Sequence, residues 1–311
     1  MRCSLEKKQT SLSSFLIFVF IVLKASASDL PPSVDDPVYA VEERFYTKTT
    51  TESIYGTEVT EMYVISDLYY VFTPDDRLLE AVHVLGYEYL VNGETAEEPL
   101  YDLLIDLVTI NEYDESLFMV DVHGLEELDR RLQTVSNPLL RQTYSQISAA
   151  ETLKNKLIAE WNNQRAITIF AVENLGEALE FDFQKISGTV FLPFTAQVMA
   201  EELEEDGELF YVVYFVEKLH PKANTYMEMI EEFTGLPLPE GVTIVDTELT
   251  TVRTTYVDAK ALLPILIEEY SLFVSTIEVG GETVEFKKET EKYSYRIPYS
   301  QEDAETEDTD L

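Results

Sequence analysis

Cysteine is almost absent from this sequence of 311 residues, with Cys3 as its single example. We expect Cys3 to be removed together with an N-terminal export signal, which would leave a mature chain without any thiol. Thiol nucleophiles, cysteine-based zinc or iron–sulfur sites and disulfide bonds are then excluded. The mature protein must be held together by its hydrophobic core, by bound ions or by partners.

Basic residues are also scarce, because 22 lysines and arginines stand against 59 aspartates and glutamates, for a formal net charge of -37. Such a field repels nucleic acids and anionic membrane surfaces, since every approach to a phosphate works against it. We therefore exclude nucleic acid as a partner. The same charge favours a protein partner, a cationic ligand or divalent cations. We expect no cofactor, and weakly bound Ca²⁺ is the one ion that the acidic surface would accommodate.

The usual catalytic motifs are missing as well. The sequence has no Gly-x-Ser-x-Gly elbow, no phosphate-binding loop, no His-Glu-x-x-His and no dinucleotide fingerprint. His83, His123 and His220 are the three histidines left for imidazole chemistry. In Asp121-Val122-His123, strand alternation would point the aspartate and the histidine to one face, where a metal or a hydrolytic base could use them. An ordinary histidine at a strand end explains the same pattern.

Long hydrophobic runs are limited to one, FLIFVFIVL from Phe15 to Leu23, which follows a basic start and precedes Ala25-Ser26-Ala27. This order is typical of a secretory signal peptide, which we place at residues 1–27. Nine apolar residues closed by Lys24 are too few to span a bilayer, which needs roughly 20. We expect a secreted, periplasmic or cell-surface protein without a transmembrane span after cleavage.

What the sequence does contain is an apparent strand, helix, strand order that occurs three times. In the first copy, an aromatic strand is followed by Thr73-Pro74-Asp75-Asp76, which predicts the start of a helix over RLLEAVHVL, and Asn92-Gly93 predicts a turn. The other helices are predicted from Thr195 and from Asp258. We therefore expect an α+β fold, with a mainly antiparallel sheet built from repeated strand-helix-strand units. Duplication and the general grammar of such folds explain the recurrence equally well.

The domain order follows from these units. We expect an extended leader at 28–38, a first α+β unit at 39–123, a helical segment at 124–165, the second and third units at 166–300, and a disordered acidic tail at 301–311. The helical segment contains two amphipathic helices, which we expect to pack on the sheet. With six basic and five acidic residues, its net charge is +1 in an otherwise strongly acidic chain. It is followed by AITIFAV, which has the length of a strand.

One acidic cluster stands out, because it gathers at the predicted C-terminal end of the second unit's helix, where the helix dipole favours positive charge. Carboxylate oxygens are the ligands that Ca²⁺ takes, so the cluster predicts a weak divalent-cation site, although solvated charges screened by salt are a simpler interpretation. Its members are Glu201, Glu202, Glu204, Glu205, Asp206 and Glu208.

These observations favour an exported, strongly acidic and non-catalytic protein that acts as a binding or interaction module. A secreted hydrolase that uses a carboxylate or the Asp-x-His pair is the alternative, because acids are too numerous for one pair to be located. A carrier of an apolar ligand is a further alternative. It is suggested by the tyrosines and phenylalanines of the strands, for which core packing is the ordinary role.

Overall fold

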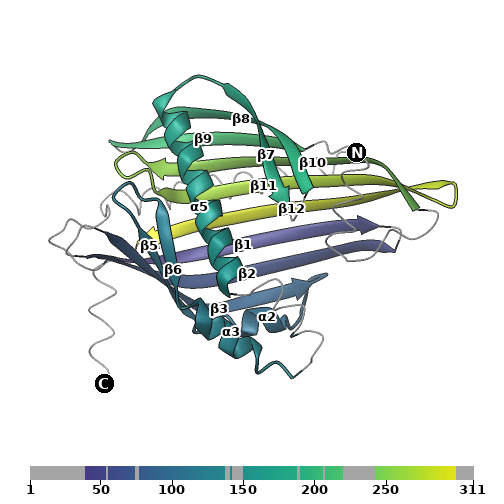
Figure 1. The fold of residues 1–311 in the computed structure, drawn as a ribbon, viewed down its shortest axis with the longest axis horizontal. Coiled ribbons are helices and arrows are strands. Elements are labelled where there is room, and N and C mark those ends of the chain that lie inside the picture. Colours follow the sequence, from purple (N-terminus) through teal and green to yellow (C-terminus); the bar gives the residue numbers. More distant parts are fainter. Residues whose placement is uncertain are drawn as a thin grey trace.

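The computed structural model describes residues 39–53, 55–73, 77–136, 141, 150–187, 190–205, 207–219 and 242–298. Within these ranges, twelve strands form one large antiparallel sheet (Figure 1). The strands are β1 (Tyr39–Ser53), β2 (Gly56–Phe72), β3 (Leu78–Val91), β4 (Glu94–Thr95), β5 (Val108–Tyr113), β6 (Met119–His123), β7 (Leu179–Ser187), β8 (Val190–Glu205), β9 (Glu208–Leu219), β10 (Val242–Asp258), β11 (Pro264–Val279) and β12 (Glu282–Pro298).

The strand order across the sheet is β6-β5-β3-β2-β1-β12-β11-β10-β9-β8-β7, and the short β4 pairs with β3. Each half of the chain is thus a meander, and the two halves meet where the first strand pairs with the last. That pairing runs from Val41 opposite Pro298 to Glu52 opposite Lys287. The middle of the sheet is therefore closed by strands from the two ends of the described chain.

Three helices accompany the sheet within the described ranges: α2 (Pro99–Asp102), α3 (Leu125–Leu132) and α5 (Ala150–Glu173). Helix α5 crosses one face obliquely, over strands of both halves (Figure 1). Beneath its first half lies a core around Leu68 and Tyr113, and beneath its second half lies one around Val198 and Val213. Each such buried side chain contributes about 1.5–3 kcal/mol, so α5 joins the halves by covering both cores.

No helix of the described ranges combines the length and apolar character that crossing a bilayer requires.

The predicted repeat of strand-helix-strand units is wrong. AQVMAEELEE from Ala196 lies in β8, where Ala196, Val198 and Ala200 are buried and alternate with the exposed Thr195 and Gln197. That period of two is the pattern of a strand with one covered face, whereas a helix would bury every third or fourth residue. Good helix formers such as Ala and Glu are overruled here by pairing with β7 and β9 and by packing under α5.

The other two predicted helices are also wrong. In RLLEAVHVL, all residues after Arg77 belong to β3. Thr73 closes the β2–β3 connection because its hydroxyl accepts the Arg77 backbone N–H at 3.1 Å. In the third case, Asp258 accepts the backbone N–H groups of Lys260 and Ala261 at 2.9 and 2.8 Å, which makes a tight turn. Strand β11 then begins at Pro264. Polar side chains that resemble helix caps therefore close turns between strands, since turns need the same acceptors.

The helical segment is confirmed in part. Helix α3 covers most of LEELDRRLQTV, and Leu157, Ile158 and Trp161 of α5 pack against the first core as predicted. The strand predicted from Ala166 is wrong, because α5 continues to Glu173 and packs its last turns on the second core. The predicted signal, leader and acidic tail lie outside the described residues.

The turn predicted at Asn92-Gly93 is confirmed, with backbone φ angles of 53° and 81° for these two residues. Positive values at both positions suit a tight hairpin, and asparagine followed by glycine tolerates them best. The segment KKETEKYSYRI, in which apolar and polar residues alternate as in a strand, is part of β12.

Candidate functional site

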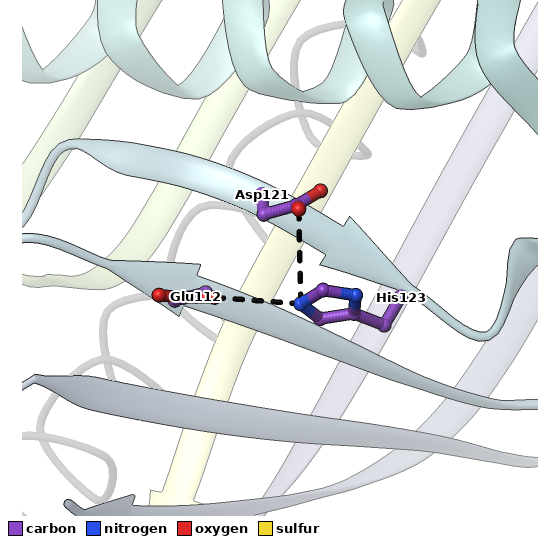
Figure 2. A group of neighbouring side chains, drawn as sticks. All are labelled: Glu112, Asp121 and His123. Carbon is purple, nitrogen blue, oxygen red and sulfur yellow. Dashed lines mark hydrogen bonds and ion pairs between the residues drawn. The ribbon is translucent and has the colours of Figure 1, made fainter.

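Glu112, Asp121 and His123 come together on the β5–β6 hairpin at one end of the sheet (Figure 2). Glu112 and Asp121 are direct partners across the two strands, while His123 is paired with Ile110. Because alternate residues of a strand point to the same side, Asp121 and His123 emerge on one side of β6, next to Glu112. The neighbouring Val122 points into the core beneath α5.

The imidazole of His123 lies between the two carboxylates. Its Nε2 atom is 3.4 Å from Oε2 of Glu112 and 3.9 Å from Oδ2 of Asp121. One ligand atom from each residue fits within 4.8 Å of the others. A nitrogen and two oxygens at this spacing are the donors that Zn²⁺ and related transition-metal ions accept. The side chains are 17%, 32% and 52% exposed for Glu112, Asp121 and His123, so the cluster is open to water.

Each carboxylate is also held by a cation on its other oxygen. Arg77 pairs with Oε1 of Glu112, and Lys154 of α5 pairs with Oδ1 of Asp121. The Arg77 hydrogen bond lowers the pKa of Glu112, and the Lys154 hydrogen bond lowers the pKa of Asp121. Both carboxylates are therefore ionised near neutral pH, and both keep one oxygen directed at His123.

The structure thus brings Asp121 and His123 together with three residues that the sequence did not single out. Glu112, Arg77 and Lys154 come from β5, the β2–β3 connection and α5. Only the alternation of VTINEY against MVDVH could have pointed to Glu112, because it would place that side chain opposite Asp121 if the two strands were taken as a hairpin. Arg77 and Lys154 depend on the tertiary fold alone.

The predicted acidic cluster has a different arrangement from the one expected, because no helix ends there. Glu201 and Glu202 are consecutive residues of β8 and point to opposite faces, and Glu204 shares the side of Glu202. Glu208 opens β9, where it is paired with Glu205. The side chain of Glu205 and the whole of Asp206 lie outside the described part of the chain. The predicted conflict with a helix dipole therefore disappears.

A different group of charged side chains, centred on Glu80, lies in the interior of the fold. Glu80 is 2% exposed and accepts hydrogen bonds from Tyr70 at 2.7 Å, Tyr113 at 2.5 Å and Asn111 at 2.8 Å, and Arg296 lies 3.5 Å away. Burial opposes ionisation of Glu80, but Arg296 and the three hydrogen bonds outweigh it and lower its pKa. This fully partnered group ties β12 to β2, β3 and β5, and its burial indicates a structural role.

Lysines and arginines of the helical segment form ion pairs with acidic side chains and hydrogen bonds with backbone carbonyls. Lys154 pairs with Asp121, whereas Arg131 donates to the backbone carbonyls of Leu103 and Ile105. Arg165 donates to the carbonyls of Ala261 and Leu262 in the β10–β11 turn, at 2.8 and 2.7 Å. The basic charge of this segment therefore fixes α3 and α5 to connections of the sheet, and only part of it offsets acidic side chains.

No protein-family model matches this chain, and no curated protein matches it. Among solved structures, the chain is similar to lipovitellin, in a structure of its lipid–protein interactions, with 6% identity and a TM-score of 0.38. The match covers 85% of this chain and 25% of the lipovitellin chain, so this chain spans about a quarter of that protein. Pseudomonas aeruginosa OccK5 (OpdH) and OpdQ match at 7% and 8% identity, each with a TM-score of 0.25, over 85% of this chain and 99% and 100% of theirs. Scores this low carry no functional information.

Proposed function

We propose that this protein is an exported, non-catalytic binding protein that takes up a divalent transition-metal ion at Glu112, Asp121 and His123. The observation that carries the proposal is the convergence of one imidazole nitrogen and two carboxylate oxygens within 4.8 Å of one another. An imidazole ligand suits Zn²⁺ better than Ca²⁺, which takes oxygen ligands. Water can complete the coordination shell, because the cluster is open to solvent.

The side chains of Arg77 and Lys154 affect the metal affinity that we expect of this site. Arg77 and Lys154 hold the carboxylates ionised and oriented, as outer partners of metal ligands commonly do. They also neutralise the two negative charges, so the attraction for a dication is smaller than that of a bare pair of acids. These opposing effects favour a site of moderate affinity that exchanges its ion.

The test is thermal unfolding of the protein with increasing Zn²⁺, compared with Ca²⁺ at the same concentrations. A ligand that binds only the native state at one hundred times its Kd stabilises it by about 2.7 kcal/mol. We expect Zn²⁺ to raise the melting temperature of the wild type, and the His123→Ala variant to lose this increase. Equal effects of Zn²⁺ and Ca²⁺ would show diffuse binding to the acidic surface and would contradict the proposal.

His83 provides a matched control for that variant. Its Nε2 atom lies 3.5 Å from Asp106, and its side chain is 30% exposed, but within the described chain it does not join a group of three metal-ligating side chains. The His83→Ala variant should therefore keep the full response to Zn²⁺. A loss of the response in this variant as well would mean that the histidines act without specific geometry.

A metal-dependent hydrolase is the second candidate, favoured by a single feature. An open depression next to the cluster is lined by Arg77, Asp114, Glu115, Ser116 and Val120, and Arg77 is shared with the proposed site. A substrate in this depression would lie close to a metal that keeps open coordination positions, as catalytic zinc does. Zn²⁺-dependent hydrolysis of nitrophenyl esters or phosphates that disappears in His123→Ala would replace the non-catalytic proposal by this one.

The apolar carrier receives less support. Beneath α5, the space lined by Trp161, Gln164, Thr255 and Leu262 amounts to about 10 Å³, which is room for roughly one water molecule. Side chains of the two cores fill the rest of the contact between α5 and the sheet. An apolar ligand would need to displace this packing, so we do not extend the proposal to such a carrier.

A further inference from the structure

Glu268 lies near the middle of β11, on the face of the sheet that α5 does not cover. Its neighbour in register on β10 is Thr254, while Thr255, one residue further, lines the small cavity under α5. Thr255 is paired with Ile267, so Ile267 faces α5 and Glu268 faces the other way. This position is distinct from the proposed metal site, which lies at the end of the sheet.

Tyrosines surround this glutamate on the same face. Tyr293 of β12 is its direct partner across the strands, and Tyr214 of β9 lies beyond Thr254 in the same row. Tyr256 lies diagonally across β10, and Tyr270 follows two residues later on β11. Burial raises the pKa of the Tyr214, Tyr256 and Tyr293 hydroxyl groups, and the negative charge of Glu268 raises each of these pKa values further.

The same row continues as an aromatic ladder into the first half of the sheet. The rings of Tyr293 and Tyr46 are 5.9 Å apart between centroids, and those of Tyr46 and Tyr63 are 4.6 Å apart. Tyr63, Tyr214 and Tyr270 remain 40%, 38% and 37% exposed. Tyrosine side chains on this side of the sheet are therefore partly accessible, and Tyr270 is the exposed one on the same strand as Glu268.

One carboxylate oxygen of Glu268 has been removed from water without gaining a partner among the described residues. Its Oε1 atom is buried and accepts no hydrogen bond from any described residue. Burial alone raises the pKa of this carboxyl to about 7. A desolvated carboxylate without a donor is unfavourable, and a bound cation would offset the loss of water.

We propose that Glu268 and the tyrosines around it bind an organic ammonium ion. The carboxylate supplies the opposite charge, and the electron-rich faces of the tyrosine rings attract a weakly hydrated cation with apolar groups. A small metal ion fits this position less well, because it would require several oxygen ligands in place of ring faces. A quaternary ammonium group has the appropriate chemistry, since it needs no hydrogen-bond acceptor.

Among the titratable groups of the surrounding strands, Glu268 determines how ammonium binding depends on pH. The pKa values of the tyrosines on β9, β10, β11 and β12 are all raised, mainly by burial, so these hydroxyls stay neutral near pH 7. Glu201 of β8 and Glu291 of β12 add negative charge near Tyr214 and Tyr293. Binding should therefore increase between pH 6 and pH 8, as the Glu268 carboxyl with a pKa of about 7 loses its proton.

Calorimetric titration of the full chain with choline tests this inference, with dimethylbutanol as the uncharged analogue in which carbon replaces nitrogen. We expect choline to bind at pH 8 at least about tenfold more tightly than dimethylbutanol, which corresponds to about 1.4 kcal/mol. The Glu268→Gln variant should lose about the same factor for choline. This variant removes a buried charge while keeping the shape, so we expect it to fold.

Glu278 is a matched control on the same strand and the same side of the sheet. It is exposed and lies ten residues away, which is roughly 33 Å along a strand. The Glu278→Gln variant removes the same charge and should bind choline like the wild type. The inference is overturned if choline does not bind, if dimethylbutanol binds equally well, or if both variants bind as the wild type does. The metal proposal is unaffected by any of these results, because His123 takes no part in this titration.

Discussion

Glu268 and Glu269 are consecutive residues of β11 that the sheet places in opposite environments. Glu269 faces the α5 side, where Arg253 donates to it at 2.9 Å and Lys292 at 2.8 Å. Burial opposes its ionisation, but Arg253 and Lys292 prevail and lower its pKa. Glu268, on the other face, has no such donor among the described residues, and burial raises its pKa to about 7.

The two faces of the sheet differ in the same way elsewhere. On the α5 side, the buried charges of Glu80 and Arg296 form a partnered network and Thr247 contacts Ser275 at 3.3 Å, whereas Nε2 of Gln164 on α5 is buried without a hydrogen-bond partner among the described residues. On the other side, large side chains such as Ile65, Tyr69 and Val252 remain exposed, and Oε1 of Glu268 has no hydrogen-bond partner among the described residues. Partnered buried charges such as Glu80 and Arg296 stabilise the fold, whereas an unpartnered carboxyl on a face with exposed large side chains is suited to binding.

The largest effect should come from breaking the satisfied side. Replacing Arg296 by methionine removes the cation from Glu80 and Glu43 and leaves a buried carboxylate uncompensated. We expect a loss of about 3–5 kcal/mol in the free energy of unfolding, measured with urea. Arg44→Met is the control, because Arg44 pairs with Glu42 at the surface and should cost at most about 1 kcal/mol. Similar losses in both variants would contradict the structural role of the buried network.

Core packing provides the next contrast between the two faces. Leu68 and Ile65 are both on β2, but Leu68 is 1% exposed under α5 and Ile65 is 39% exposed on the other side. Leu68→Ala should lower the free energy of unfolding by about 3 kcal/mol, since it removes buried methyl groups and leaves a cavity. Ile65→Ala should cost less than about 1 kcal/mol. The assignment of the faces fails if Ile65→Ala is the more damaging change in chemical denaturation.

Neutralising Glu269 should have a smaller but clear effect. In Glu269→Gln, Arg253 and Lys292 lose the charge that they share, and we expect a loss of about 2 kcal/mol in urea unfolding at pH 7. The neighbouring Glu268→Gln should not be destabilised at this pH, because no donor depends on that carboxyl in the described structure. Equal destabilisation of the two variants would remove the distinction between the faces.

The smallest effect is a difference in pH dependence. The folded pKa of Glu268 is raised from 4.5 to about 7, so the unfolded chain releases this proton first as the pH rises. Stability from this group is complete below pH 4.5 and declines until the pH passes the folded pKa. Glu268→Gln should remove about 1 kcal/mol of that decline between pH 5 and pH 8, a value reduced for partial exposure. Identical slopes for the variant and the wild type in urea unfolding would exclude a perturbed Glu268.

Several elements could be predicted from local pattern, and their success has a common cause. LEELDRRL repeats its apolar side chains at helical spacing, and KYSYRI and the Asn92-Gly93 turn have the alternation and the residues of a hairpin sheet. These signals depend on residues close in sequence. Asp121 and His123 could be paired for the same reason, because they are two residues apart on one strand.

Other elements required information from distant parts of the chain. RLLEAVHVL and AQVMAEELEE contain strong helix formers, but their apolar residues also fit alternation, and only pairing with neighbouring strands decides between the two. The apolar run from Ala166 has the length of a strand but becomes helix because it continues α5 over the second core. Local propensity is worth tenths of a kcal/mol per residue, which tertiary packing exceeds.

By itself, the sequence determined the charge of the protein, its single cysteine and the alternation of several strands, since composition and alternation need no knowledge of contacts. Only the tertiary structure decided which acids matter. With 59 aspartates and glutamates, no local feature distinguishes Glu80, Glu112 or Glu268 from the others. Each acquires its properties from side chains on other strands or helices, because desolvation and pairing depend on distance in space rather than in sequence.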